Sequence, residues 1–141
     1  MDNLARSLAA DGVLDRYELA DESEAKLTLF RAGDQACASV EMSGTREVIL
    51  LQLASGQYRD HSTVYSENER IDTIVEMLEV VDHYVRRNYY EVDVVCGGRV
   101  VSSEMHLGDS GEWIYHSQSG ILAKAIRLFS HKKVVRHPGS A

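Results

Sequence analysis

The segment from about residue 67 to 87 predicts one long amphipathic helix, and this helix limits the folds open to the chain. Ser66 and Glu69 have the Ser-x-x-Glu spacing of a capping box, in which each side chain accepts a hydrogen bond from the other residue's backbone amide. Apolar residues recur at helical spacing along one side: Ile71, Ile74, Val75, Leu78, Val81 and Val85, widened by Met77 and Tyr84. A stripe this wide is expected to be buried against a sheet.

Alternating apolar residues predict strands on both sides of this helix. Before it, strands are expected at 13–20, at three places within 25–53, and at 57–65. After it come 90–96 and 99–107, joined by Gly97-Gly98, and a short strand at 113–115. Short helices are expected at 3–11 and 120–131. Asp93 lies between Val92 and Val94, so its side chain is expected to face solvent.

The order of these elements predicts an α+β fold. Its antiparallel sheet has about five to six strands, with the long central helix and the short N- and C-terminal helices packed on it. A chain of 141 residues is expected to form a single domain, assigned to residues 1–131. Residues 132–141 are expected to form a basic, flexible tail.

Charge is divided unevenly along the chain. All 22 acidic residues lie within the first 123 positions, where they outweigh the basic residues by 12 charges, whereas the last 18 residues carry five basic residues and no acidic one. A negative globular body repels phosphate and favours a basic partner. We therefore expect a protein partner with a basic surface, no nucleic acid, and a monomer or homodimer.

Cysteine usage and hydropathy indicate a location. Cys37 and Cys96 lack metal-site spacing and are expected to be buried free thiols. No basic segment followed by an apolar run marks a signal peptide, and no apolar stretch approaches the roughly 20 residues that span a bilayer. These features predict no membrane partner and a reducing cytoplasm as the location.

Residues of the types that catalyse reactions or bind metals do not form a specific motif in this sequence. Residues 108–111 read Gly-Asp-Ser-Gly, as around the nucleophile of trypsin-like proteases, but Glu112 follows where that family has glycine, so a polar turn is the better interpretation. His106 and His116 could converge on one loop, which leaves a small hydrolase using the 106–116 region as an alternative. We expect no enzyme activity, no catalytic residue, no cofactor and no metal.

Acidic and aromatic side chains are the better candidates for contact with a partner. Acidic residues crowd the segment 11–24 and occupy the polar side of the long helix, and aromatic residues lie at the ends of elements. The candidate partner-binding residues are Asp15, Glu18, Asp21, Glu22, Asp72, Glu76, Glu79, Tyr89, Trp113 and Tyr115.

The acidic segment 11–24, the acidic side of helix 67–87 and the tyrosine-rich loops resemble those of small bacterial immunity proteins. The resemblance implies a non-catalytic domain that neutralises a cognate toxin domain by occluding its basic cleft. The element order is also similar to that of a class of secretion chaperones, which are acidic homodimers that bind an effector protein. The leucine-leucine-x-x-Asn signature associated with those chaperones is absent before the long helix, so the chaperone stays an alternative. Neither resemblance assigns a binding residue.

Overall fold

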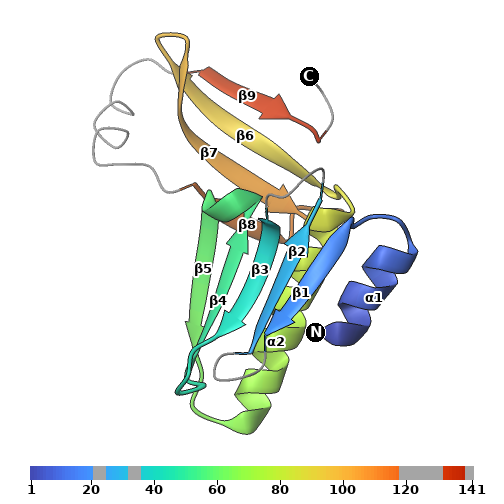
Figure 1. Cartoon of the computed structure of the whole chain (residues 1–141). Helices are drawn as coiled ribbons and strands as arrows, with labels where there is room; N and C mark the ends of the chain where they lie inside the picture. The colour runs from blue at the N-terminus through green and yellow to red at the C-terminus, as the bar shows by residue number, and fades with distance from the viewer. Residues whose placement is uncertain (21–24, 32–35, 118–131, 139–141) are drawn as a thin grey trace.

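The computed structural model describes residues 1–20, 25–31, 36–117 and 132–138. These residues form two antiparallel sheets and two α-helices (Figure 1). The first sheet is a meander in which each strand pairs with the next along the chain. Its strands are β1 Arg16–Ala20, β2 Lys26–Phe30, β3 Ala36–Met42, β4 Val48–Leu53 and β5 Tyr58–Thr63.

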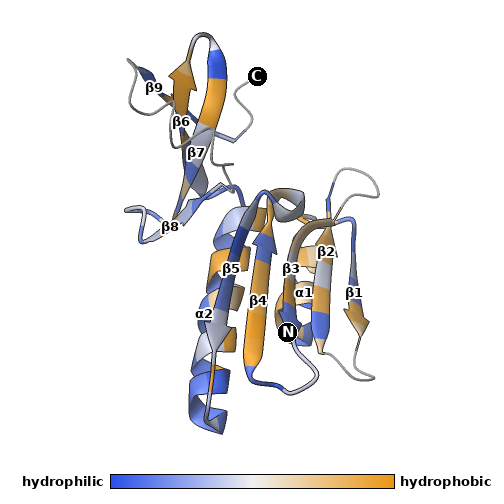
Figure 2. Ribbon diagram, turned by 90° about the vertical axis from the view of Figure 1, so that its left-hand side faces the viewer, coloured by the Kyte–Doolittle hydropathy of each residue, from blue (hydrophilic) through white to orange (hydrophobic). Residues whose placement is uncertain are grey.

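Helices α1, Asp2–Ala10, and α2, Glu67–Val85, cover one face of the first sheet (Figures 1 and 2). Alternate strand residues point to this face and are buried, as the period-two pattern predicts. They include Leu27, Leu29, Val40, Ile49, Leu51 and Leu53. The opposite face carries polar and small side chains such as Glu18, Thr28 and Ser39. The fold is therefore α+β, as predicted.

The buried face of α2 differs from the predicted stripe along its first half. Val81 and Val85 are fully buried as expected, but Ile71 and Val75 are each 51% exposed. The buried residues of α2 are Met77, Val80, Val81, Tyr84 and Val85, and Ile74 and Leu78 pack against the core while partly buried. The first sheet contacts the side of the helix that carries these residues. The side carrying Ile71 and Val75 is left exposed, and Val75 lines a hollow together with Leu4 of α1.

The predicted capping box is present at the start of α2. The Ser66 side chain accepts a hydrogen bond from the Glu69 amide, and the Glu69 carboxylate accepts one from the Ser66 amide. The same carboxylate also accepts from the amide of Tyr65, and these bonds lower the pKa of Glu69.

Removal of the cap should destabilise the protein locally. We expect Ser66→Ala to lower the free energy of unfolding by about 1 kcal/mol, because an amide of the first turn loses its acceptor. Urea denaturation measures this change. The control is Thr45→Ala, which removes an exposed turn hydroxyl that bonds the Ser43 side chain at 3.2 Å rather than a helix amide. An unfolding curve for Ser66→Ala identical to that of the wild type would contradict the prediction.

The chain after α2 builds a second sheet rather than extending the first, so the predicted single sheet is wrong in this respect. The strands of the second sheet lie in the order β8-β7-β6-β9: β6 Tyr89–Cys96, β7 Arg99–Leu107, β8 Trp113–His116 and β9 Lys132–Arg136. Gly97 and Gly98 both have positive φ angles, as a tight hairpin turn between β6 and β7 requires. Met105 and Leu107 of β7 join the core beneath the first sheet.

Two further predictions need correction near the C-terminus. Residues 132–136, expected in a flexible tail, form β9, because Arg136 binds two carboxylates of β6 and the backbones pair antiparallel. Asp93, expected to face solvent, is only 2% exposed. The side chains of Asp93 and Val94 do point to opposite faces of β6, as alternation predicts. Both faces are covered at this point, because Val94 is buried as well. The helix predicted at 120–131 lies outside the described residues.

The two cysteines are free thiols in different sheets, Cys37 in β3 and Cys96 at the end of β6. Both are half-buried, where full burial was predicted. Burial raises the pKa of Cys37, and the charge of Arg31 opposes this rise. Within the described part of the chain, no helix combines the length and the apolar character needed to cross a membrane.

Candidate functional site

A groove runs between α1 and α2 on the helical side of the molecule. It encloses about 630 Å³ and is lined by Leu4 of α1 and by Val75, Leu78, Glu79, Asp82 and His83 of α2. Its lining is apolar at Leu4, Val75 and Leu78 and acidic at Glu79 and Asp82. Ile71, one turn before Val75, continues the exposed apolar surface toward the start of α2.

Exposed aliphatic side chains distinguish this groove from an ordinary helix surface. Ile71 and Val75 project on the same side of α2, because they are four residues apart, and Leu78 follows three residues later. Single exposed apolar residues are common on protein surfaces, but a contiguous run beside a hollow is typical of a contact site. The groove is therefore the surface best suited to receive an apolar side chain from a partner.

Acidic residues border this apolar run. Asp72, Glu76 and Glu79 are exposed along α2, as the sequence predicted. Asp82 has a structural partner: Arg86 donates to it at 2.9 Å and also binds Asp11, just beyond α1, at 2.8 Å. These ion pairs connect the end of α1 to α2 beside the groove.

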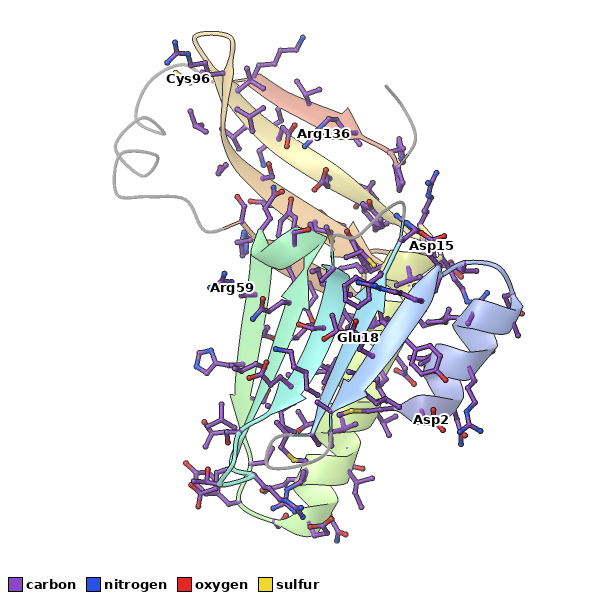
Figure 3. All side chains as sticks on the ribbon, in the orientation of Figure 1. Asp2, Asp15, Glu18, Arg59, Cys96 and Arg136 are labelled. Carbon is purple, nitrogen blue, oxygen red and sulfur yellow. The ribbon has the colours of Figure 1, made fainter. Side chains whose placement is uncertain are left out.

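The remaining acidic candidates lie elsewhere. Glu18 is in β1 and pairs with Thr28 on the face of the first sheet that the helices do not cover (Figure 3). Asp15 is exposed just before β1. Asp21 and Glu22 lie outside the described residues. The acidic candidates within the described residues thus belong to two surfaces, one around β1 and one along α2.

The three aromatic candidates pack where α2 meets the second sheet. Tyr89 stacks on Tyr84 with ring centroids 5.2 Å apart, and Trp113 contacts the ring of His83 at 5.3 Å. Tyr89, Trp113 and Tyr115 are all half-buried against the core. Burial raises the pKa values of Tyr89 and Tyr115. Trp113 contacts His83, which lines the groove, whereas Tyr89 packs against the core.

A second hollow, of about 610 Å³, lies on the uncovered face of the first sheet. Its lining is mostly small and polar, with Glu18, Lys26, Thr28, Ser39 and Gln52 among the residues. Lys26 already forms an ion pair with Glu41 at 2.6 Å. Because it offers few apolar contacts, this hollow is the weaker candidate for a stable protein interface.

The histidines of the 106–116 region lie on neighbouring strands of the second sheet, His106 in β7 and His116 in β8. His106 stacks on Tyr90 with ring centroids 4.7 Å apart. Glu104 lies between the two histidines, 3.8 Å from His106 Nε2 and 3.7 Å from His116 Nδ1. Ser110 Oγ donates to Glu112 rather than to either histidine. Among the described residues, no group of three or more His, Cys, Asp or Glu side chains is placed to hold a metal ion.

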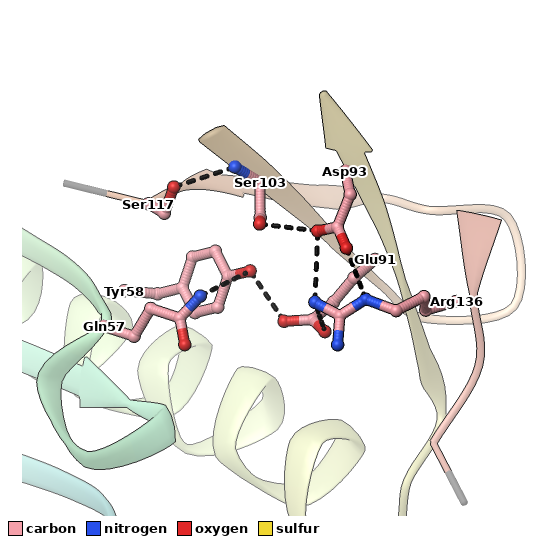
Figure 4. Close-up of polar contacts among 7 residues, drawn as sticks. All are labelled: Gln57, Tyr58, Glu91, Asp93, Ser103, Ser117 and Arg136. Carbon is pink, nitrogen blue, oxygen red and sulfur yellow. Dashed lines mark hydrogen bonds and ion pairs between the residues drawn. The ribbon is translucent and has the colours of Figure 1, made fainter. Parts of the chain in front are cut away.

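A polar cluster that sequence reasoning missed joins the two sheets (Figure 4). The Tyr58 hydroxyl, from β5, donates to Glu91 at 2.6 Å, and Ser103 Oγ donates to Asp93 at 2.6 Å. Arg136 of β9 binds Glu91 at 3.0 Å and Asp93 at 2.5 Å. The spacing of Glu91 and Asp93, two residues apart on one strand, was the available signal, because it places both carboxylates on one face.

The charges in this cluster are held by their partners. Burial alone raises the pKa of Asp93, but hydrogen bonds from Arg136 and Ser103 and the charge of Arg136 outweigh it, so the pKa lies below its ordinary value. Burial and the bond to Glu91 raise the pKa of Tyr58. At neutral pH, Asp93 is therefore ionised and Tyr58 is protonated. These protonation states favour the hydrogen bonds and ion pairs that connect the two sheets.

Comparison of this chain with models of protein families, with curated proteins and with solved structures found no match.

Proposed function

We propose that this protein is a non-catalytic binding domain that docks a basic protein partner on the groove between α1 and α2. The observation that carries the proposal is the pairing of an exposed apolar run, Ile71 and Val75, with an acidic border on the same helix. The occupant is an amphipathic segment of the partner. Its apolar residues fill the groove, and its lysines or arginines face Asp72, Glu76 and Glu79.

Within this class, an immunity or inhibitor protein is the most specific proposal. Such a protein needs no catalytic group, since it acts by covering the basic cleft of a toxin domain. Opposite charge accelerates the encounter, and the desolvated apolar contacts slow dissociation. The acidic body supports fast encounter with a basic partner, and the apolar groove supports slow dissociation. The two free thiols fit a reducing cytoplasm.

One observation also favours the secretion-chaperone alternative. The same groove could take an amphipathic segment of an effector, and exposed Ile71 and Val75 could contribute to a homodimer. Light scattering distinguishes the two proposals. The chaperone is supported if the isolated wild-type chain is dimeric at micromolar concentration and Val75→Glu is monomeric. The inhibitor is supported if the wild-type chain is monomeric.

The apolar half of the groove can be tested directly. For the basic protein that co-purifies with the chain, we expect Ile71→Ser with Val75→Ser to raise Kd at least about tenfold, because anchor residues at an interface each contribute about 1 kcal/mol or more. Isothermal titration calorimetry measures Kd. The fold should persist, since half of each side chain is already in water.

The matched control is Leu19→Ser with Ile114→Ser, which removes two aliphatic side chains that are 44% and 50% exposed elsewhere on the surface. This control variant should bind like the wild type. Equal affinities for all three proteins would exclude the groove as the docking site.

A further inference from the structure

Within the described part of the chain, strand β9 makes few side-chain contacts. It reads Lys-Lys-Val-Val-Arg and lies at the edge of the second sheet, antiparallel to β6. Four of its five residues are exposed, and Val135 is 56% exposed. Because little apolar surface is buried along β9, backbone pairing and one side chain must supply most of its attachment.

That side chain is Arg136, which lies opposite Glu91 in the strand register. Its guanidinium binds both Glu91 and Asp93. With β9 in place, the Glu91 and Asp93 side chains are 16% and 3% exposed, whereas the Arg136 side chain is 48% exposed. Buried carboxylates without a cation are strongly unfavourable, and a planar guanidinium can serve two of them at once. The edge of β6 therefore favours an arginine at one position.

The lysines of β9 lie opposite apolar residues of β6. Lys133 and Lys132 pair with Val94 and Val95 in the register, so Arg136 is the position at which a basic residue of β9 meets carboxylates of β6. Strand addition to a sheet edge obtains affinity from backbone hydrogen bonds and specificity from alternate side chains. An extended segment with an arginine at the position of Arg136 can make both kinds of contact.

We propose that the β6 edge is a docking site for an extended, arginine-bearing basic segment of a partner protein, and that β9 occupies this site in the isolated chain. The partner's arginine takes the place of Arg136 between Glu91 and Asp93. This surface is separate from the helix groove, so the proposal goes beyond the function proposed above. β9 competes as an intramolecular ligand, which lowers the apparent affinity for the incoming segment.

A labelled peptide tests the proposal on the full chain. The probe is fluorescein-labelled Lys-Lys-Val-Val-Arg-His, the sequence of residues 132–137. In fluorescence anisotropy, Arg136→Ala should bind this peptide at least about tenfold more tightly than the wild type does, because the competing strand has lost its anchor. The same peptide with alanine in place of arginine should bind at least about tenfold more weakly.

The matched control is Arg59→Ala, which removes an exposed arginine of β5 whose Nε donates to the Gly56 carbonyl. It should bind the peptide like the wild type. No binding to folded Arg136→Ala, or binding that ignores the peptide's arginine, would overturn the proposal. Ile71→Ser with Val75→Ser should leave peptide affinity unchanged, so failure of this proposal is distinguishable from failure of the groove.

A second measurement avoids the substitution at Arg136. Wild-type chain labelled with ¹⁵N is mixed with excess unlabelled peptide, and amide hydrogen exchange is followed by NMR. Displacement of β9 should accelerate exchange at residues 132–136 while residues 91–95 keep their protection. Unchanged exchange at residues 132–136 under saturating peptide would contradict the docking model.

Discussion

Leu51→Ala should lower the free energy of unfolding by about 2–5 kcal/mol, because it leaves a cavity in the centre of the core. Leu51 lies in β4, the fourth strand of the meander, and is 1% exposed on the face that the helices cover. Urea denaturation with linear extrapolation measures the loss.

Leu19→Ala is the matched control for this core substitution. Leu19 points to the same face of the first sheet but is 44% exposed at the edge strand β1. The same truncation there should cost less than about 1 kcal/mol. Comparable losses at both positions would mean that the core does not lie between the helices and the inner strands.

Arg136→Ala should destabilise the protein more than substitutions at other exposed positions do. It removes the cation shared by Glu91 and Asp93 and leaves a nearly buried carboxylate without its ion pair. Breaking a fully buried pair costs about 3–5 kcal/mol; because Arg136 is half exposed and water can enter, we expect roughly 2 kcal/mol. Chemical denaturation at pH 7 measures this loss, with Arg59→Ala as the exposed-arginine control.

The effect of Arg136→Ala should depend on pH in a defined direction. The folded-state pKa of Asp93 lies below its unfolded value, so the ion pair stabilises the fold above the unfolded pKa, about 4. This contribution is lost as the pH falls through the folded pKa. The stability difference between wild type and Arg136→Ala should therefore narrow below about pH 4. A difference that stays constant between neutral and strongly acidic pH would contradict the assigned role of Asp93.

Local sequence signals predicted the elements well, because their causes are local. The Ser66–Glu69 capping box, the Gly97-Gly98 turn and the alternation along β3 each depend on residues close together in the chain. The exposed acidic residues of α2 were predictable for the same reason, since helical periodicity places Glu76 and Glu79 away from the core.

The missed features depend on contacts between distant parts of the chain. Residues 132–136 have the composition of a polar tail, and nothing local shows that Arg136 meets Asp93, 43 positions away. The exposure of Val75 was equally hidden, since a wide apolar stripe does not show which of its sides the sheet will cover. The two errors correspond to the two surfaces now proposed as docking sites.

We expect the α2 groove, rather than the surface around β1, to meet the basic partner. Two double charge reversals separate these surfaces: Glu76→Lys with Glu79→Lys on α2, and Asp15→Lys with Glu18→Lys at β1. Both change the net charge equally, so any difference between them reports position. Surface-plasmon resonance with the co-purifying basic protein gives association rates at low and at high salt.

We expect the α2 reversal to lower the association rate about tenfold at low salt, and the β1 reversal to change it by less than about twofold. The difference should shrink at about 0.5 M salt, because screening at this ionic strength shortens the Debye length to about 4 Å. Equal association rates for both reversals, or a larger decrease for the β1 reversal, would contradict docking on the groove between α1 and α2.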